Sequence, residues 1–139
     1  NNLNHEYDYV MLLQPTSPLR NERHIDESIE QMILKNANAV ISVCKSEYKK
    51  TIINVLPENN DMSNFIVSDD KNGQSEYYRI NGAIYLCKLN FFLKEKTFFI
   101  SEKIFAYKME TSNSLDIDTK LDFEIAKFLI EKNESSNYF

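Results

Sequence analysis

Two aspartates separated by one residue, Asp116 and Asp118, form the most informative chemical pattern in the sequence. In an extended segment, residues i and i+2 point to the same side of the chain, so both carboxylates can face one cation. Oxygen ligands at this spacing suit Mg²⁺, which typically takes one or two carboxylates and completes its coordination with water and substrate phosphate. Alternatively, one aspartate caps the helix that follows while the other is solvated.

A second candidate is the segment 14–20, with the sequence QPTSPLR, which follows the apolar run 9–13. Its two prolines make the loop stiff, because proline fixes φ and restricts the preceding residue. Open α/β sheets bind ligands at the carboxyl ends of their strands, so this loop is expected at a ligand-binding edge. The alternative is a proline-rich turn whose hydroxyls bond to their own backbone.

Arg79 lies in the sequence YRINGA at 78–83, in a predicted turn at the mouth of a strand. Arginine is the side chain best shaped to bind a carboxylate through two hydrogen bonds, and the alternative is a surface arginine beside a turn. Phe98 and Phe99 are adjacent in a predicted strand, so they should face opposite sides. One ring must then contact something other than the core, unless both are plain core residues.

Hydrophobic periodicity predicts the elements that position these residues. The run 9–13 is typical of a central strand buried on both faces of a parallel sheet, and 39–44 is the next strand. Between them, residues 22–35 should form an amphipathic helix capped by Asn21. Strand, helix and strand with short connections indicate a right-handed βαβ unit, so the predicted fold class is α/β. The apolar stripe of this helix consists of Ile25, Ile29, Met32 and Ile33.

Residues 45–78 interrupt the pattern and are predicted to form an inserted hairpin. Such a hairpin is marginal alone, so it should pack on the body of the domain or on another subunit. The core then resumes with a strand at 83–86, a short helix near 88–94, and strands at 98–100 and 104–109.

A last helix is predicted to begin near Thr119, which can form a capping box with Asp122. The buried stripe of this helix should consist of Leu121, Ile125, Phe128 and Leu129. We therefore expect one domain over 1–132, followed by a polar tail over 133–139.

Composition excludes several classes of protein. The 139 residues carry 16 basic and 21 acidic side chains, a net charge of −5, so we do not expect binding to nucleic acid. The sequence has no apolar run long enough to span a membrane, so we expect a cytoplasmic protein that does not bind membranes. The chain has two glycines, Gly73 and Gly82, which excludes both a GxGxxG turn and a Walker loop.

Three motifs together resemble the N-acylneuraminate cytidylyltransferases: LLQPTSPLR at 12–20, YRINGAIYL at 78–86 and SLDIDTKLDFE at 114–124. They come in the order and spacing of that family, and the similarity runs from about Tyr9 to Lys132. The resemblance implies a Rossmann-like α/β sheet and the transfer of CMP from CTP to a nine-carbon 2-keto sugar acid, with release of pyrophosphate.

The resemblance also implies roles for individual residues. Asp116 and Asp118 would hold the catalytic Mg²⁺, and Arg79 would lie near the sugar carboxylate. Gln14 and Tyr85 would contact the sugar, and Phe98 and Phe99 would pack against its acyl group. The insert would cross to the second subunit of a homodimer, where Lys50 and Lys71 match basic positions of the partner's site.

One departure from the family is large, because its members begin with a strand and a glycine- and lysine-rich loop that binds the CTP phosphates. The chain therefore resembles the C-terminal part of the catalytic domain, which leaves the strand at 9–13 with an unpaired edge. Alone it is expected to be inactive. The alternatives are a 3-deoxy-manno-octulosonate cytidylyltransferase, or a non-catalytic module for dimerisation and sugar binding.

Overall fold

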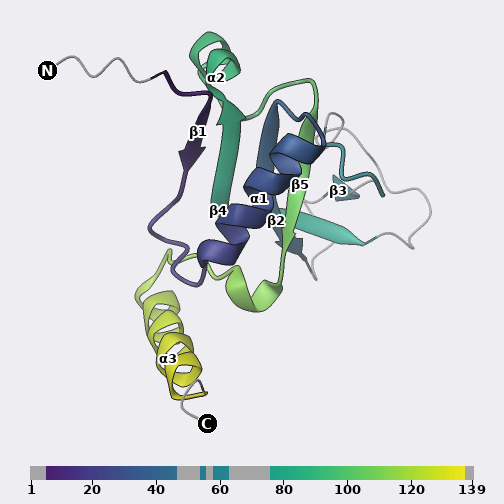
Figure 1. Ribbon diagram of the computed structural model, residues 1–139. Coiled ribbons are helices and arrows are strands. Elements are labelled where there is room, and N and C mark those ends of the chain that lie inside the picture. Colours follow the sequence, from purple (N-terminus) through teal and green to yellow (C-terminus); the bar gives the residue numbers. More distant parts are fainter. Residues whose placement is uncertain (1–5, 47–53, 56–57, 63–75, 137–139) are drawn as a thin grey trace, which may run out of the picture.

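The computed structural model describes residues 6–46, 54–55, 58–62 and 76–136. These form a mixed sheet with the strand order β1-β4-β2-β5, and a short strand β3 also pairs with β4. Helix α1 lies across one face of this sheet, α2 follows the end of β4, and α3 projects beyond the opposite end (Figure 1). The predicted α/β class is confirmed in this coarse sense, since helices and a partly parallel sheet share one core.

Strand β1 (Tyr9–Leu12) lies at the edge of the described sheet and pairs with β4 (Tyr77–Lys88) in antiparallel register, from Tyr9 opposite Lys88 to Leu12 opposite Tyr85. The prediction of a central strand in a parallel sheet was wrong for the described residues. Tyr9 and Leu12 are each 42% exposed, because β4 covers one side of β1 and no other described strand covers the second.

Helix α1 (Glu22–Leu34) begins with the predicted cap. The Asn21 side chain accepts a hydrogen bond from the backbone of His24, and His24 Nδ1 accepts one from the backbone of Asn21. Of the predicted apolar stripe, Met32 is buried and Ile25 is half-buried, but the other two positions were wrong. The face against the sheet consists of His24, Ser28 and Met32, whereas Ile29 and Ile33 are exposed.

Strands β2 (Ala39–Lys45) and β5 (Ile104–Met109) pair in parallel, close to their predicted bounds. Strand β4 lies between β1 and β2 and is antiparallel to both, so the predicted βαβ unit is split by a strand from later in the chain. The buried apolar residues of β2 and β5 form the centre of the core: Ala39, Val40, Ile41, Val43, Cys44, Ile104, Ala106, Tyr107 and Met109.

The predicted turn at 78–83 is absent, because β4 continues through it. The strand is instead irregular at this point. Ile41 of β2 pairs with Tyr85 while Val43 pairs with Ile80, so β4 carries extra residues opposite a short step of β2. Gly82 lies in this β-bulge with φ +78°, a conformation that glycine adopts without strain.

Helix α2 (Leu89–Glu95) matches its prediction, but residues 98–100 form no strand. Of the predicted insert, the structure describes β3 (Asn54–Val55), which pairs with the start of β4, and residues 58–62, whose Met62 is buried. Most of the predicted hairpin, including Lys50 and Lys71, lies outside the described residues.

Helix α3 (Lys120–Ser136) follows a short 3-10 helix, Thr111–Asn113, and extends into the predicted tail. Its capping box is confirmed, since Asp122 Oδ2 accepts from the Thr119 backbone and Thr119 Oγ1 accepts from the Asp122 backbone. The predicted buried stripe was wrong. Among the side chains described for this helix only Ala126 is buried, and Leu121 and Phe128 are more than 60% exposed.

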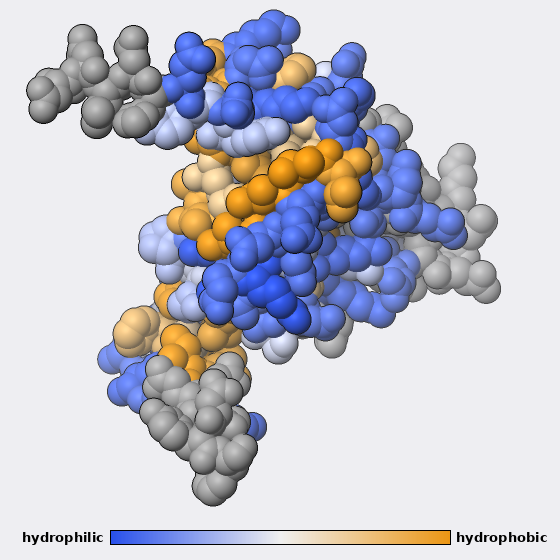
Figure 2. All heavy atoms as spheres, in the orientation of Figure 1, coloured by the Kyte–Doolittle hydropathy of each residue, from blue (hydrophilic) through white to orange (hydrophobic). Residues whose placement is uncertain are grey.

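Apolar side chains therefore reach the surface over α1 and again on α3 (Figure 2). Among the described residues, no helix is long and apolar enough to cross a membrane.

Candidate active site

Three oxygen atoms from two separate segments lie around the position that a Cβ on Gly82 would occupy. A Cβ placed on Gly82 would lie 2.5 Å from Gln14 Oε1 and 3.6 Å from both Ser17 Oγ and Asp116 Oδ2. Gln14 and Ser17 come from the loop after β1, and Asp116 comes from the segment before α3. The structure thus brings together Gln14 and Asp116, which are 102 positions apart and were predicted from separate motifs.

The loop 14–20 is folded onto β4 by Arg20. One guanidinium nitrogen of Arg20 donates to the carbonyl oxygens of Gln14, at 3.1 Å, and of Ala83, at 2.8 Å. The backbone of Ser17 also donates to the Gln14 carbonyl. The loop is therefore closed on itself and fixed beside the bulge, as its stiffness predicted, and it is not an independent surface turn.

A buried polar network holds the bulge from the other side. Ser42 Oγ donates to Asn81 Oδ1 at 2.6 Å and accepts from the backbone of Ile84 at 2.7 Å. Asn81 Nδ2 donates to Ser114 Oγ at 2.8 Å, and Ser114 Oγ donates to the Glu110 carbonyl. Ser42, Asn81 and Ser114 are all almost fully buried. The network ties β2 and β4 to the segment that carries Asp116.

Sequence analysis missed this network. The available signal was the Asn81-Gly82 pair, because a glycine inside an apolar strand pattern often marks a bulge or a close backbone approach. The pair was assigned to a turn instead, and the buried partners Ser42 and Ser114 have no distinctive spacing.

The two aspartates differ in their surroundings. Asp116 is half-buried and its Oδ1 atom is buried without a hydrogen-bond partner among the described residues, whereas Asp118 is exposed. Neither carboxylate is needed as the cap of α3, because Thr119 and Asp122 form that cap. This removes the main reason for the alternative interpretation.

A desolvated carboxylate oxygen beside an amide oxygen and a hydroxyl is a donor set that suits Mg²⁺. The described residues contain no group of three or more His, Cys, Asp or Glu side chains that could hold a metal ion. A Mg²⁺ site at this position would therefore have one or two carboxylate ligands, and water or substrate oxygens would complete the coordination.

The predicted aromatic residues form one group. The Tyr85 ring lies 5.8 Å from Phe98 and 6.1 Å from Phe99, measured between ring centroids. Burial, and then the negative charge of Asp116, raise the pKa of the Tyr85 phenol. The expectation that Phe98 and Phe99 face opposite sides was wrong, because this segment is not a strand and both rings contact Tyr85.

Arg79 lies on β4 two residues before Asn81, and its Nη2 donates to the carbonyl oxygen of Ser114 at 3.1 Å. It is half-buried and is therefore not the fully exposed surface arginine of the alternative interpretation. Through Ser114, Arg79 contacts the same segment that carries Asp116.

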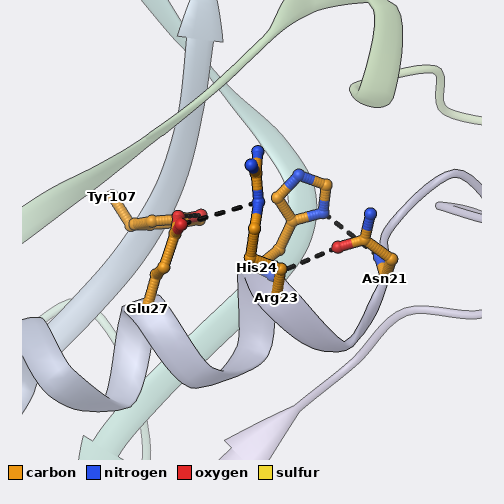
Figure 3. Close-up of polar contacts among 5 residues, drawn as sticks. All are labelled: Asn21, Arg23, His24, Glu27 and Tyr107. Atoms are coloured by element: carbon orange, nitrogen blue, oxygen red, sulfur yellow. Dashed lines mark hydrogen bonds and ion pairs between the residues drawn. The ribbon is translucent and has the colours of Figure 1, made fainter.

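A second polar cluster supports the start of α1, directly after the loop 14–20 (Figure 3). Tyr107 of β5 donates to Glu27 at 2.5 Å, and Arg23 pairs with the same carboxylate at 3.5 Å. His24, 2% exposed, points between Asn21 and the sheet, and burial lowers its pKa. The cluster fixes the first turn of α1 and hence the end of the loop.

A shallow hollow of about 370 Å³ lies at the start of β1 and contains none of the predicted site residues. Its lining consists of Tyr7, Asp8, Tyr9, Lys88 and Asn90.

The amino-acid sequence is similar to those of several known proteins. The chain is 35% identical over 130 residues to an N-acylneuraminate cytidylyltransferase of Escherichia coli, and 33% identical over 116 residues to one of Streptococcus agalactiae. These matches cover 91% and 81% of this chain. It is also 26% identical over 94% of its length to a CMP-N,N'-diacetyllegionaminic acid synthase of Legionella pneumophila. No family model matches the chain.

These relatives are cytidylyltransferases, which act as nucleotidyltransferases. More narrowly, the chain is homologous to a part of the N-acylneuraminate cytidylyltransferases, as its three motifs predicted. It spans 31% and 28% of the length of the first two relatives and 57% of the third.

Proposed function

We propose that the chain supplies the sugar-binding and metal-binding part of an enzyme that transfers CMP from CTP to a nine-carbon 2-keto sugar acid of the sialic acid type. The observation that carries the proposal is the convergence of Gln14, Ser17 and Asp116 on Gly82. Relatives that are named for N-acylneuraminate, diacetyllegionaminic acid and pseudaminic acid support an acylated sugar of this size.

In the proposed reaction the anomeric hydroxyl of the sugar attacks the α-phosphorus of CTP. A new oxygen–phosphorus bond forms, the hydroxyl proton passes to solvent water, and the bond to the leaving pyrophosphate breaks. Mg²⁺, held by Asp116 and Asp118, would offset the negative charge on the phosphate oxygens. Gln14 would hold and orient the sugar from the loop 14–20, whose position depends on Arg20.

The remaining residues would select the sugar. The guanidinium of Arg79 would bind its carboxylate, since an arginine can donate two parallel hydrogen bonds to such a group. Tyr85 would contact the ring, and Phe98 and Phe99 would enclose the acyl group. Two aromatic rings around one apolar substituent suit an acylated sugar better than 3-deoxy-manno-octulosonate, which has no acyl group to enclose.

The proposal extends to assembly and location. The insert at 45–78 would act as a dimerisation hairpin that carries Lys50 and Lys71 to the active site of the second subunit, in a cytoplasmic homodimer. The chain alone would bind its ligands without turnover. Binding of the CTP phosphates needs several backbone N–H donors and a cation, and the glycine- and lysine-rich loop that supplies them in the family has no match in this sequence. The alternative, a non-catalytic binding module, makes a different prediction: no turnover occurs even when a second polypeptide supplies the missing part of the enzyme.

A pyrophosphate-release assay tests the proposal with CTP, Mg²⁺ and N-acetylneuraminate. The 139-residue chain is measured alone and together with a second polypeptide taken from the unmatched part of the E. coli relative. We expect release in the mixture only, and its loss in Asp116→Asn. Asp26→Asn is the matched control, because Asp26 is an exposed aspartate of α1. Equal release by the two variants would overturn the assignment.

A further inference from the structure

Ser17 has a buried hydroxyl that no described group satisfies. The residue is 1% exposed, and its Oγ has no hydrogen-bond partner among the described residues. An unsatisfied buried hydroxyl destabilises a folded protein, so each case needs a physical explanation.

The other buried serines show that this is not a general property of the core. Ser28 Oγ donates to the Ile25 carbonyl at 2.7 Å, Ser42 Oγ to Asn81, and Ser114 Oγ to the Glu110 carbonyl. All three are as buried as Ser17. Of these four serines, the unpartnered one is the one that faces Gly82.

A second unpartnered oxygen belongs to the carboxylate of Asp116, which also reaches Gly82. Asp116 Oδ1 is buried without a partner, and the other oxygen of this carboxylate is as far from the Gly82 Cβ position as Ser17 Oγ is, at 3.6 Å. A serine hydroxyl can donate one hydrogen bond and accept two, whereas a carboxylate only accepts. A ligand atom that satisfies both through hydrogen bonds must therefore donate one to Asp116, and it can either accept one from Ser17 or donate one to it.

The surrounding charge excludes an anion from this position. The nearest groups are the Asp116 carboxylate and the amide oxygen of Gln14. The guanidinium of Arg20 already donates to the carbonyl oxygens of Gln14 and Ala83. A phosphate or carboxylate oxygen offers no hydrogen to Asp116 Oδ1, while a neutral O–H group does.

We propose that Ser17 and Asp116 together bind one O–H-bearing oxygen over Gly82, and that Ser17 is a ligand-binding residue of this site. The identity of that oxygen rests on the proposed function. It belongs either to water on the divalent cation or to a hydroxyl of the sugar acid. Ser17 thus remains unsatisfied in the free protein because its partner arrives with the ligand.

Ser17→Ala and Ser28→Ala test the proposal in the purified chain. Thermal unfolding without ligand comes first. Ser17→Ala should unfold at the wild-type temperature or above it, since no hydrogen bond is lost, whereas Ser28→Ala should unfold at a lower temperature. If Ser17→Ala destabilises the chain as much as Ser28→Ala, the hydroxyl is already satisfied and the proposal is wrong.

Ligand binding forms two further arms, Mn²⁺ followed by water-proton relaxation and N-acetylneuraminate followed by NMR. We expect Ser17→Ala to weaken one of them by about fivefold, the effect of losing one hydrogen bond, while Ser28→Ala changes neither. A weaker Mn²⁺ affinity identifies metal-bound water, and a weaker sugar affinity identifies a sugar hydroxyl. Unchanged affinity in both arms overturns the proposal.

Failure of this inference differs from failure of the proposed function. If Asp116→Asn loses CMP transfer while Ser17→Ala keeps its affinities for Mn²⁺ and N-acetylneuraminate, only the proposed role of Ser17 is wrong. Full CMP transfer in Asp116→Asn would instead show that the proposed metal site is wrong.

Discussion

Arg20 Nη1 lies 2.8 Å from the carbonyl oxygen of Ala83, a residue 63 positions further along the chain. The same nitrogen contacts the Gln14 carbonyl, so one side chain fixes both the loop and its distance from the bulge at Gly82. The first motif of the sequence ends at this arginine and the second begins five residues before Ala83. The first and second motifs therefore occur together because a hydrogen bond joins them in the structure.

Arg20→Lys should therefore impair sugar binding more than folding. A lysine keeps the charge but cannot reproduce the planar guanidinium, so Gln14 loses its fixed position. In the complemented enzyme we expect KM for the sugar to rise about tenfold or more, with a smaller change in kcat. Arg23→Lys is the control, because the one ion pair that Arg23 makes among the described residues is exposed and lies on the first turns of α1, just after the loop that holds Arg20. A KM equal in both variants would contradict the role of Arg20.

Gly82→Ala should displace Gln14. The added Cβ would lie 2.5 Å from Gln14 Oε1, and alanine is strained at φ +78°. We expect weaker sugar binding together with about 1–2 kcal/mol of lost stability. The double variant Gly82→Ala with Gln14→Ala separates the two causes, because it relieves the contact but not the backbone strain. Strictly additive losses in this cycle would show that the two residues are not coupled.

Asp118→Asn should reduce turnover by orders of magnitude in the complemented enzyme while the chain remains folded. The substitution is isosteric and the side chain is exposed, so thermal unfolding should not change. Asp26→Asn again serves as the control. Near-normal turnover at saturating Mg²⁺ would show that Asp118 is not a metal ligand and that Asp116 acts without it.

The two phenylalanines should separate selectivity from stability. Phe99 is 49% exposed, so Phe99→Ala should reduce the preference for N-acylated over unacylated sugar and leave unfolding nearly unchanged. Phe98 also packs on Phe92, with 4.8 Å between ring centroids, so Phe98→Ala should cost up to about 3 kcal/mol of stability. Competition between the two sugars measures the first effect and urea denaturation the second. An unchanged preference in both variants would mean that the acyl pocket has been misplaced.

His24 should make the start of α1 sensitive to acid. Burial lowers its pKa, so the unfolded chain binds a proton more readily than the folded one, and stability falls as the pH drops below the ordinary value of about 6.5. Protonation also converts Nδ1 from an acceptor to a donor and breaks its bond with the Asn21 backbone. His24→Gln keeps an acceptor at this position without titrating in this range. Urea midpoints between pH 7.5 and 5.5 should therefore fall less in the variant, and equal slopes would contradict this explanation.

The sequence predicted the helices and strands better than it predicted which elements pack against one another. Residues 22–35, 39–44 and 104–109 have strong periodicity or clear caps, and their elements appear within a few residues of the expected bounds. The edge position of β1 did not follow from composition, because the run 9–13 is equally apolar whether one or two strands flank it. It was expected only from the family resemblance, since the first strand of the family has no match in this sequence. Similarly, the apolar residues of α3 suggest a buried stripe, but their burial depends on which part of the protein lies against them.

For the site, residue type and motif identified Gln14, Arg79, Tyr85 and Asp116, which the structure brings close to the bulge or to the segment beside it. Sequence analysis did not identify Ser17 or Asn81, since small polar residues acquire a role only through the atoms that surround them. The error at 78–83 shows the same limit. A glycine after an asparagine indicates a turn locally, and only the pairing with β2 converts it into a bulge.

The strand order also has a consequence for biosynthesis. In the series β1-β4-β2-β5, none of the neighbouring strands is joined by a tight turn, and Tyr9 pairs with Lys88. On the ribosome, β1 and β2 emerge before either of the strands that flank β2 has been made, so both wait with open hydrogen-bonding groups until β4 leaves the exit tunnel. Pairing between such distant segments is intrinsically slow. The order of the strands in the sheet therefore keeps the backbone groups of β2 without their final partners until most of the described sheet has been synthesised.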